Sequence, residues 1–537
     1  MTNPITDFAK SDCILVVGSN YAENHPIVSR WVLDAKERGA TLIVADPRFT
    51  PTAWTADIFL QLLPGTDITL INALMHVIIS ENLYDTDFVA ERTTDFEALR
   101  QCAQDYLPER AERLTRVPAE RIIQAARAYA TADAAAIIYC MGVTQHTYGT
   151  QTVIDCANLA MLCGHIGRPG TGVNPLRGQD NVQGACDMGA LPNVYPGYQP
   201  VTEPAIQEKF ELAWDVHLSN QPGLTVVEMA HAAHRGDLRA MLIMGENPAV
   251  GDPNTRHVRE GLKRLDFLAV IELFMSETAE LADVVLPAAS FAEKHGTKTT
   301  TDRRVQWFEQ AIEPIGEARP DWQIICDLAE HLGLTRAFRY RTVADVLAEI
   351  NRVTPSYAGI TPARVQGTLG GIPWPCPTPD HPGTPTLHVG QFSRGLGRFV
   401  PVEYIEPAEL PDEEYPLVLT TGRVVMHYNS GAMTRRTHAL HQREPELFFQ
   451  VHPSTAQRFG IAAGDMTQVS TRRGEAQARA RVTRQIDEGV IFMPFHFPAT
   501  NVLTIDALDP KAKIPEYKVA ACKISPINGQ IEENKAG

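Results

Sequence analysis

Short apolar runs that end at a strand-to-loop turn set the framework for this chain. Residues 13–18 (CILVVG) form one such run, and residues 41–46 (TLIVAD) form a second. Between them, the apolar side chains of residues 26–38 fall on one helical face, and Gly39 ends that helix. A strand–helix–strand unit of this kind predicts a parallel sheet, in which ligands bind beyond the carboxyl ends of the strands.

A turn from strand to glycine recurs at three separate places, Gly18, Gly142 and Gly245. Because glycine lets the backbone approach a ligand closely, three such turns predict a bound phosphate or nucleotide. No G-x-G-x-x-G follows the first strand, so the standard dinucleotide fingerprint is absent from the sequence there. Asp46 could pair with the donor edge of a nucleotide or could cap a turn, and the sequence leaves both interpretations open.

Residues 174–189 (NPLRGQDNVQGACDMG) are rich in glycine and in side-chain amides. They show neither helical nor strand periodicity, which predicts an ordered loop. Arg177 offers a planar fork that suits a carboxylate. On composition alone, a structural loop held by its own amides is favoured over a binding loop.

The rest of the chain continues the alternation and then changes character. Expected helices begin at Ile68 and Pro118, and expected strands lie at 135–140, 240–245, 267–273 and 282–287. The adjacent pair Arg303 and Arg304 predicts a solvated loop at 295–306, and the prolines and glycines of 354–411 predict a long irregular connection. Beyond it, five short strands at 415–423, 446–453, 465–474, 475–483 and 489–497 predict a closed, mostly antiparallel barrel.

These patterns predict an α/β protein with discontinuous Rossmann-like parallel-sheet domains and a C-terminal β-barrel. We expect a first α/β domain over 1–178 and a second, incomplete one over 179–285. A mixed segment with the proline-rich connection covers 286–411, and the barrel covers 412–537.

The amino-acid composition narrows the range of partners expected for this chain. The formal net charge of −16 disfavours nucleic acid or an anionic membrane as a main partner, because both need clustered cations. No apolar run reaches membrane-spanning length, so no direct membrane insertion is expected.

The nine scattered cysteines contain no CxxC, which argues against a zinc site or iron–sulfur cluster held by this chain alone. Such an odd, scattered set suits a reducing compartment and predicts a cytoplasmic protein.

Several segments resemble the catalytic subunits of molybdenum- or tungsten-dependent formate dehydrogenases, within the molybdopterin oxidoreductase superfamily. They include NPLRGQDNVQGACDMGALPNVYPGY, GSNYAENHP, VADPR, MGVTQHTYGT, CGHIGRPGTGVNP, LIMGENP, GTKTTTDRRVQ and IPEYK. The resemblance runs from Met1 to about Ser525, and the Arg177 loop is specific to the formate enzymes. It implies a bis-molybdopterin guanine dinucleotide cofactor bound mainly by the first α/β domain and the barrel.

The resemblance also implies roles for individual residues. Arg177 matches the arginine that orients formate, and we expect it to be catalytic. The expected cofactor-binding residues are Gly18, Asn20, Asp46, Arg48, Gly65, Asp67, Met141, Gly142, Gln145, Gly178, Gln179, Asn181, Gly245, Glu246, Thr421, Arg423, His427, His496, Asn501 and Lys518. Asp180 departs from the asparagine expected at its position.

A larger departure concerns the metal. The family supplies its metal ligand, a cysteine or selenocysteine, and a 4Fe-4S cluster from a segment that precedes the part resembling this chain. We expect no metal ligand within the chain itself, and we expect the chain to be the C-terminal part of a longer subunit. The upstream nucleotide sequence tests this expectation.

For the complete enzyme, the resemblance implies oxidation of formate to carbon dioxide, with electrons passed through the iron–sulfur centre to other subunits or carriers. Two alternatives are a nitrate reductase-like molybdopterin oxidoreductase and a non-catalytic iron–sulfur subunit of the complex I type. The chain alone is not expected to be active without its metal ligand.

Overall fold

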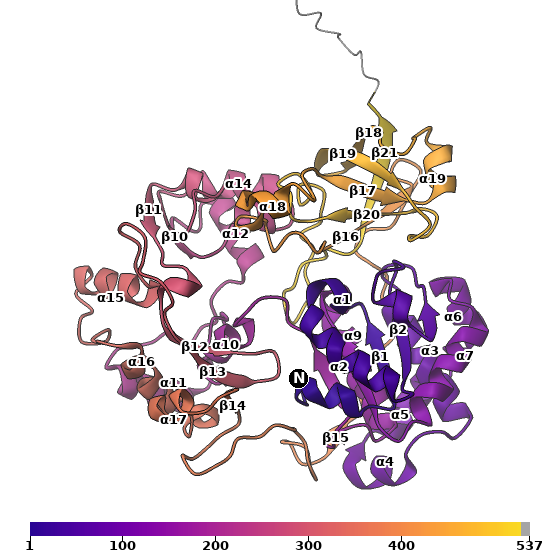
Figure 1. Ribbon diagram of the computed structural model, residues 1–537, viewed down its shortest axis with the longest axis horizontal. Helices are drawn as coiled ribbons and strands as arrows, with labels where there is room; N and C mark the ends of the chain where they lie inside the picture. Colours follow the sequence, from indigo (N-terminus) through magenta and orange to yellow (C-terminus); the bar gives the residue numbers. More distant parts are fainter. Residues whose placement is uncertain (528–537) are drawn as a thin grey trace, which may run out of the picture.

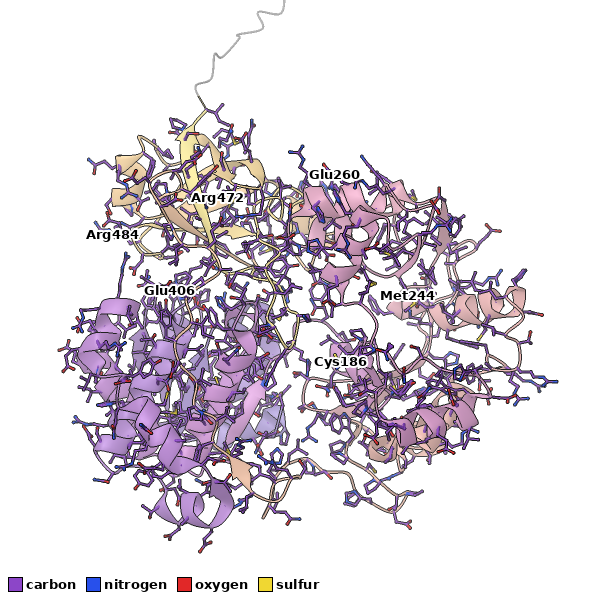
Figure 2. All side chains as sticks on the ribbon, turned by 180° about the vertical axis from the view of Figure 1, so that it is seen from behind. Cys186, Met244, Glu260, Glu406, Arg472 and Arg484 are labelled. Carbon is purple, nitrogen blue, oxygen red and sulfur yellow. The ribbon has the colours of Figure 1, made fainter. Side chains whose placement is uncertain are left out.

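The computed structural model describes residues 1–527. Its elements fall into four groups, a first α/β unit, a second α/β unit, a mixed group and a barrel, which Figure 1 shows arranged around the middle of the molecule. Figure 2 shows Glu406 between the first unit and the barrel, on the connection that joins them. The predicted fold class is confirmed, whereas the boundaries at 178, 285 and 411 stay predictions.

The first unit is a five-stranded parallel sheet in the order β3-β2-β1-β5-β6. Its strands are β1 (Cys13–Val17), β2 (Thr41–Ala45), β3 (Ile58–Leu60), β5 (Ala135–Tyr139) and β6 (Gly172–Pro175). The chain builds outward from β1 to β3 and then restarts at β5 on the other side, so β1 and β5 flank the point where the strand order reverses. Ligands bind at such points in parallel sheets.

Helices cover both faces of this sheet, which explains why its strands are continuous apolar runs. Leu15 packs on the side of α3 (Asp67–Ser80), α7 (Ala119–Ala130) and α9 (Gly149–Leu162). Val16, pointing to the opposite face, packs on the side of α2 (Pro26–Glu37). The smaller helices are α1 (Tyr21–Asn24), α4 (Thr86–Arg92), α5 (Phe96–Ala103), α6 (Pro108–Thr115) and α8 (Met141–Thr144).

The second unit is a three-stranded parallel sheet in the order β11-β10-β9. It comprises β9 (Ala240–Met244), β10 (Phe267–Glu272), β11 (Val284–Pro287), α12 (Val226–Arg235), α13 (Pro248–Gly251) and α14 (Thr255–Leu262). Its core lies on the side that faces α12 and α14. On β9, Leu242 and Met244 are about half exposed, and Figure 2 labels Met244.

The mixed group corrects one prediction. Residues 295–306 are not a solvated loop, because β12 (Gly296–Thr299) and β13 (Arg304–Phe308) form an antiparallel pair. Arg303, in the turn between them, is only 2% exposed. The remaining elements are β14 (Ile372–Pro373), α10 (Val182–Asp187), α11 (Pro204–Trp214), α15 (Asp321–His331), α16 (Val343–Val353) and α17 (Pro362–Gln366).

Burial of Arg303 has a clear cause. Its guanidinium donates to the backbone carbonyls of Met1, Thr2, Trp374, Thr384 and Pro385. Burial lowers the pKa of Arg303 to about 10. This side chain therefore joins the start of the described chain to the segment that follows β14.

The barrel is closed in the order β16-β20-β17-β19-β18-β21. Its strands are β16 (Leu417–Gly422), β17 (Phe448–Val451), β18 (Met466–Thr471), β19 (Gly474–Val482), β20 (Val490–Pro494) and β21 (Ala520–Pro526), with α19 (Pro453–Arg458) after β17. Four of the six pairings are antiparallel and two are parallel, as a mostly antiparallel barrel requires. The sequence patterns missed β21, which closes the barrel between β16 and β18.

Residues 506–518, here called the strap, reach from the barrel to the first unit. The carboxylate of Asp509 accepts hydrogen bonds from the backbone N–H and the hydroxyl of Thr150, each at 2.9 Å. Glu516 accepts from the backbone N–H of Thr147 at 3.0 Å. The strap thus satisfies donors at the start of α9, which otherwise lack intrahelical partners.

Candidate functional site

Two predicted glycines meet at the point where the strand order reverses. The N–H of Gly142 donates to the carbonyl oxygen of Gly18 at 3.1 Å. A Cβ on Gly142 would lie 2.4 Å from that oxygen, and Gly18 adopts a left-handed conformation with φ of +56°. Only glycines fit this close approach, which brings the ends of β1 and β5 together.

Charged groups gather beside these glycines, where the first unit faces the barrel. Asp46 accepts from the N–H of Arg48 at 2.9 Å, and the guanidinium of Arg48 lies 3.5 Å from the ring centre of Phe492 in the barrel. Lys518, on the strap, donates to the carbonyl of Thr421 at 2.8 Å. Burial raises the pKa of Asp46 to about 6 and lowers that of Lys518 to about 8.

A buried histidine forms the next layer. His146 Nδ1 lies 2.8 Å from Glu516, and its Nε2 lies 2.9 Å from the carbonyl of Gly142 and 3.9 Å from Asp67. Burial favours the neutral ring, but Glu516 and Asp67 outweigh it and raise the pKa of His146. Next to it, the carbonyl of Gln145 accepts from the backbone N–H of Tyr517. These contacts fix the turn after β5 against the strap.

Arg423, after β16, carries unpaired donors. Its Nε and Nη1 are buried, and neither has a hydrogen-bond partner within residues 1–527. The guanidinium lies 4.7 Å from the ring centre of Tyr428, and a Cβ on Gly178 would lie 3.7 Å from its Nη1. A buried guanidinium without partners is unfavourable, so this position fits an anionic ligand.

Other buried polar atoms in the described chain also lack partners. Ser19 Oγ, Asn24 Oδ1 and His25 Nδ1 lie between the end of β1 and the start of α2, and Asn501 Oδ1 lies after β20. Native proteins leave few such atoms unsatisfied. Together with Arg423, they fit a polar ligand that lies between the first unit and the barrel.

The segment around Arg177 is more ordered than the sequence indicated. The prediction of a loop throughout 174–189 is wrong, because α10 begins after Asn181, whose φ is +62°. Asn181 Oδ1 accepts from the N–H of Thr299 at 2.8 Å, which fixes the helix start against β12. A short helix with an internal Gly184 shows too little periodicity for sequence analysis to detect.

Arg177 itself is held from two sides. Its N–H donates to Thr301 Oγ1 at 3.1 Å, its carbonyl lies 2.7 Å from His25 Nε2, and its Nε donates to Gln183 at 2.8 Å. In the described part of the chain neither Nη nitrogen has a hydrogen-bond partner, so the bidentate edge of the fork is open to an anion. The loop then contacts the barrel, since Gly178 accepts from Tyr428 and Gln179 donates to Asn429.

The second unit contributes two acidic side chains of its own, Glu246 and Asp252. Gly245 follows β9 with φ of +63°, and no atom lies within 4 Å of the Cβ it would carry. Glu246 is solvent-exposed, and desolvation raises its pKa. Burial and Glu246 both raise the pKa of Asp252. Asn501 connects this unit to the barrel by donating to the carbonyl of Val250 at 2.8 Å.

The remaining predicted residues contact other groups of the protein and do not touch Arg177. Asn20 bonds to Glu23 and Thr52, and both ring nitrogens of His427 contact Glu444 and Thr434. His496 bonds to Val424 and Asn429, while Gly65 packs against Pro407. Met141 is 40% exposed beside Gly142. The assignment of these positions to cofactor binding stays a prediction.

Sequence analysis missed some residues that the structure places at the site. His25 lies within the quoted segment GSNYAENHP, but nothing in its spacing singles it out. Tyr428 contacts both Arg423 and the Arg177 loop. Burial raises the pKa of Cys140, whose Sγ donates to the carbonyl of Leu176. All three become visible only once distant segments are brought together.

Three further observations concern the described part of the chain. Across residues 1–527, no three His, Cys, Asp or Glu side chains are grouped so that they could hold a metal ion. No helix in this range is long and apolar enough to cross a membrane. The nine cysteines are all free, and five of them are buried.

The fold and the site together define an α/β protein in which charged side chains gather between a parallel sheet and a closed barrel. Residues 1–331 match the family model described as molybdopterin oxidoreductase, and residues 417–521 match the molybdopterin dinucleotide binding domain. The chain belongs to the molybdopterin oxidoreductase family.

Its relatives make the class more specific. The chain is 51% identical to the F420-dependent formate dehydrogenase subunit alpha of Methanocaldococcus jannaschii, and 49% identical to the F420-dependent formate dehydrogenase 1 subunit alpha of Methanococcus maripaludis. Each match covers 98% of this chain and 78% of the relative. The solved structure of acetylene hydratase from Pelobacter acetylenicus superposes with a TM-score of 0.78 at 23% identity, over 97% of this chain and 78% of that one. This last similarity concerns the fold.

Proposed function

We propose that this chain is the catalytic chain of a formate dehydrogenase and oxidises formate to carbon dioxide, a proton and two electrons. The observation that carries the proposal is the geometry of Arg177. Its fork is held at Nε by Gln183 and open at both Nη nitrogens within the described chain. Formate is the smallest carboxylate, and such a fork can bind it through two parallel hydrogen bonds. The similarity to formate dehydrogenase alpha subunits supports the same substrate.

The cofactor we propose is a bis-molybdopterin guanine dinucleotide that carries molybdenum or tungsten. When bound, it supplies a metal centre that takes up the two electrons of formate. Gly18 and Gly142 provide a close backbone approach, and Arg423, Arg48 and Lys518 provide positive charge for its anionic groups. The side chains of the second unit, Glu246 and Asp252, suit the donor edge of a guanine.

In this mechanism the protein binds and orients the substrate. Arg177 would hold the carboxylate, so that the C–H bond of formate points away from the guanidinium. Arg423 adds positive charge on the neighbouring side and favours the anion over neutral molecules. The contacts of the Arg177 loop with Tyr428 and Asn429 hold the loop against the barrel.

Electron transfer needs partners. We propose that electrons leave through a 4Fe-4S cluster to further subunits or a soluble carrier, and that a cysteine or selenocysteine outside this sequence ligates the metal. The designation "subunit alpha" of the relatives supports a multisubunit assembly. We further propose a cytoplasmic location, which the nine free cysteines support.

The test uses the protein purified in its native complex. Metal analysis is expected to find molybdenum or tungsten, and a viologen dye is expected to be reduced with formate and not reoxidised with nitrate. Nitrate reduction without formate oxidation would identify the nitrate reductase alternative. Absence of both metals and both activities from the intact complex would identify the non-catalytic alternative.

A further inference from the structure

Gln183 connects Arg177 to a buried carboxylate. Its Oε1 accepts from Arg177 Nε at 2.8 Å, and its Nε2 donates to Asp187 Oδ1 at 2.7 Å. Gln183 and Asp187 lie one helical turn apart on α10, and they are 3% and 1% exposed. The three side chains therefore form a continuous buried chain of hydrogen bonds that starts at the fork.

The donors and acceptors in this series of hydrogen bonds can be arranged in only one way. A guanidinium only donates and an ionised carboxylate only accepts, so the amide of Gln183 must present oxygen to Arg177 and nitrogen to Asp187. The opposite amide orientation would place two donors against each other at Arg177 and two acceptors against each other at Asp187. The amide thus holds Arg177 Nε in one direction.

Asp187 is itself held by groups from outside α10. Tyr198 donates to its Oδ1 at 2.8 Å, and Tyr357 donates to its Oδ2. Tyr357 also bonds to Thr299 of β12 at 2.9 Å. Burial raises the pKa of Asp187, and its donors oppose that shift. Three donors therefore converge on the two oxygens of Asp187, as is typical of a carboxylate. These donors come from three separate segments, which together determine the position of Asp187.

We propose that Gln183 and Asp187 are positioning residues that orient the Arg177 fork for formate. This inference rests on the proposed function. Arg177 touches the substrate, whereas Gln183 and Asp187 act through it. Because Gln183 occupies Nε, the two Nη nitrogens, which lie in one plane, remain for bidentate binding of the carboxylate.

The main test compares Gln183→Met with Gln183→Glu in the cofactor-loaded enzyme, with rates normalised to metal content. Methionine fills a similar volume but makes neither bond, so kcat/KM for formate is expected to fall about 10-fold to 100-fold through loss of orientation. A protonated glutamate presents a carbonyl to Arg177 and an O–H to Asp187, and two adjacent buried carboxyls favour sharing one proton. Gln183→Glu is therefore expected to retain more activity than Gln183→Met, increasingly so at lower pH.

A double-mutant cycle separates positioning from packing. If Gln183 acts through Arg177, adding Gln183→Met to Arg177→Lys should change kcat/KM by less than about twofold beyond Arg177→Lys alone. Independent, multiplicative losses would overturn the proposal. Gln207→Met is the matched control, because Gln207 on α11 also donates to a carboxylate, Glu211, but contacts no arginine in the described structure. It should leave formate kinetics unchanged.

A crystal structure of Gln183→Met provides a readout independent of activity. The Arg177 guanidinium is expected to have turned from its wild-type direction, and an unchanged guanidinium would overturn the proposal. Failure of the proposed function has a different signature. In that case the wild-type complex oxidises no formate, whereas formate oxidation with a large loss in Arg177→Lys and wild-type kinetics in Gln183→Met overturns only the positioning role.

Discussion

Gly142 and Gly18 are joined by a hydrogen bond of 3.1 Å at the ends of two adjacent parallel strands, with no room for a side chain between them. Gly142→Ala would place a methyl group 2.4 Å from a backbone oxygen. Backbone must move to accommodate it, so we expect destabilisation by about 3 kcal/mol or more and reduced cofactor content. Thermal unfolding and pterin analysis measure the two effects. Gly367→Ala, whose Cβ would lie 3.4 Å from its nearest atom, is the control and should retain both.

Arg177→Lys keeps the charge at the fork and removes its bidentate geometry. We expect KM for formate to rise and kcat/KM to fall by about 100-fold, on the scale that misplacement of a substrate costs. Steady-state kinetics with a viologen acceptor measure this. Arg100→Lys, at an exposed arginine that pairs with Glu97 on α5, should match the wild type. Unchanged kinetics in Arg177→Lys would remove Arg177 from the substrate site.

His165 makes stability depend on pH. It is 1% exposed, and burial together with Arg168, which donates to its Nδ1, favours the neutral ring, whereas the carbonyl of Tyr129 beside its Nε2 partly opposes them. Burial lowers the pKa of His165 to about 4, below the value of about 6.5 in the unfolded chain. Between these values the unfolded state binds the extra proton, so stability is lost as the pH falls from 6.5 toward 4.

The corresponding variant is His165→Gln. Between pH 7 and pH 5 the free energy of unfolding of the wild type should decrease by about 2 kcal/mol more than that of the variant. Urea unfolding at the two pH values measures the difference. His217→Gln removes an exposed imidazole and should follow the wild type. Parallel pH dependence in His165→Gln and the wild type would contradict the assignment.

Arg303→Met tests the buried guanidinium that bonds to five backbone carbonyls. The substitution leaves those acceptors without a donor, so we expect a loss of about 3 kcal/mol or more. Arg336→Met, at an exposed arginine, should lie within about 0.5 kcal/mol of the wild type. Denaturant midpoints compare the two. A small effect of Arg303→Met would mean that water or side chains replace the guanidinium readily.

Local patterns predicted the elements whose structure is decided by their neighbours in sequence. The apolar runs at 13–18, 41–46 and 135–140 are strands of a parallel sheet because helices cover both of its faces. The five barrel strands expected after residue 412 are present, but β21 was missed. It pairs with β16 and β18, two strands far from it in sequence, and a pattern within seven residues does not reveal that.

The site was predictable only in part, for the same physical reason. The glycine turns at Gly18 and Gly142 were predicted, and the structure brings these two together, whereas a carboxylate at Arg177 stays a prediction. The burial of Arg303 and the contact of Tyr428 with the Arg177 loop depend on segments about 70 to 300 residues away. Residue spacing carries no signal for such contacts, so most site residues followed from family resemblance.

The cap of α9 has a consequence for the order of folding. Asp509 bonds to Thr150 across 359 positions of the chain. During synthesis from the N-terminus, these bonds to α9 therefore form only after the strap has been made, long after the strands of the first sheet have left the ribosome. The last strand of the barrel, β21, follows the strap directly, so a chain interrupted before the strap lacks both the bonds to Thr150 and the strand that closes the barrel.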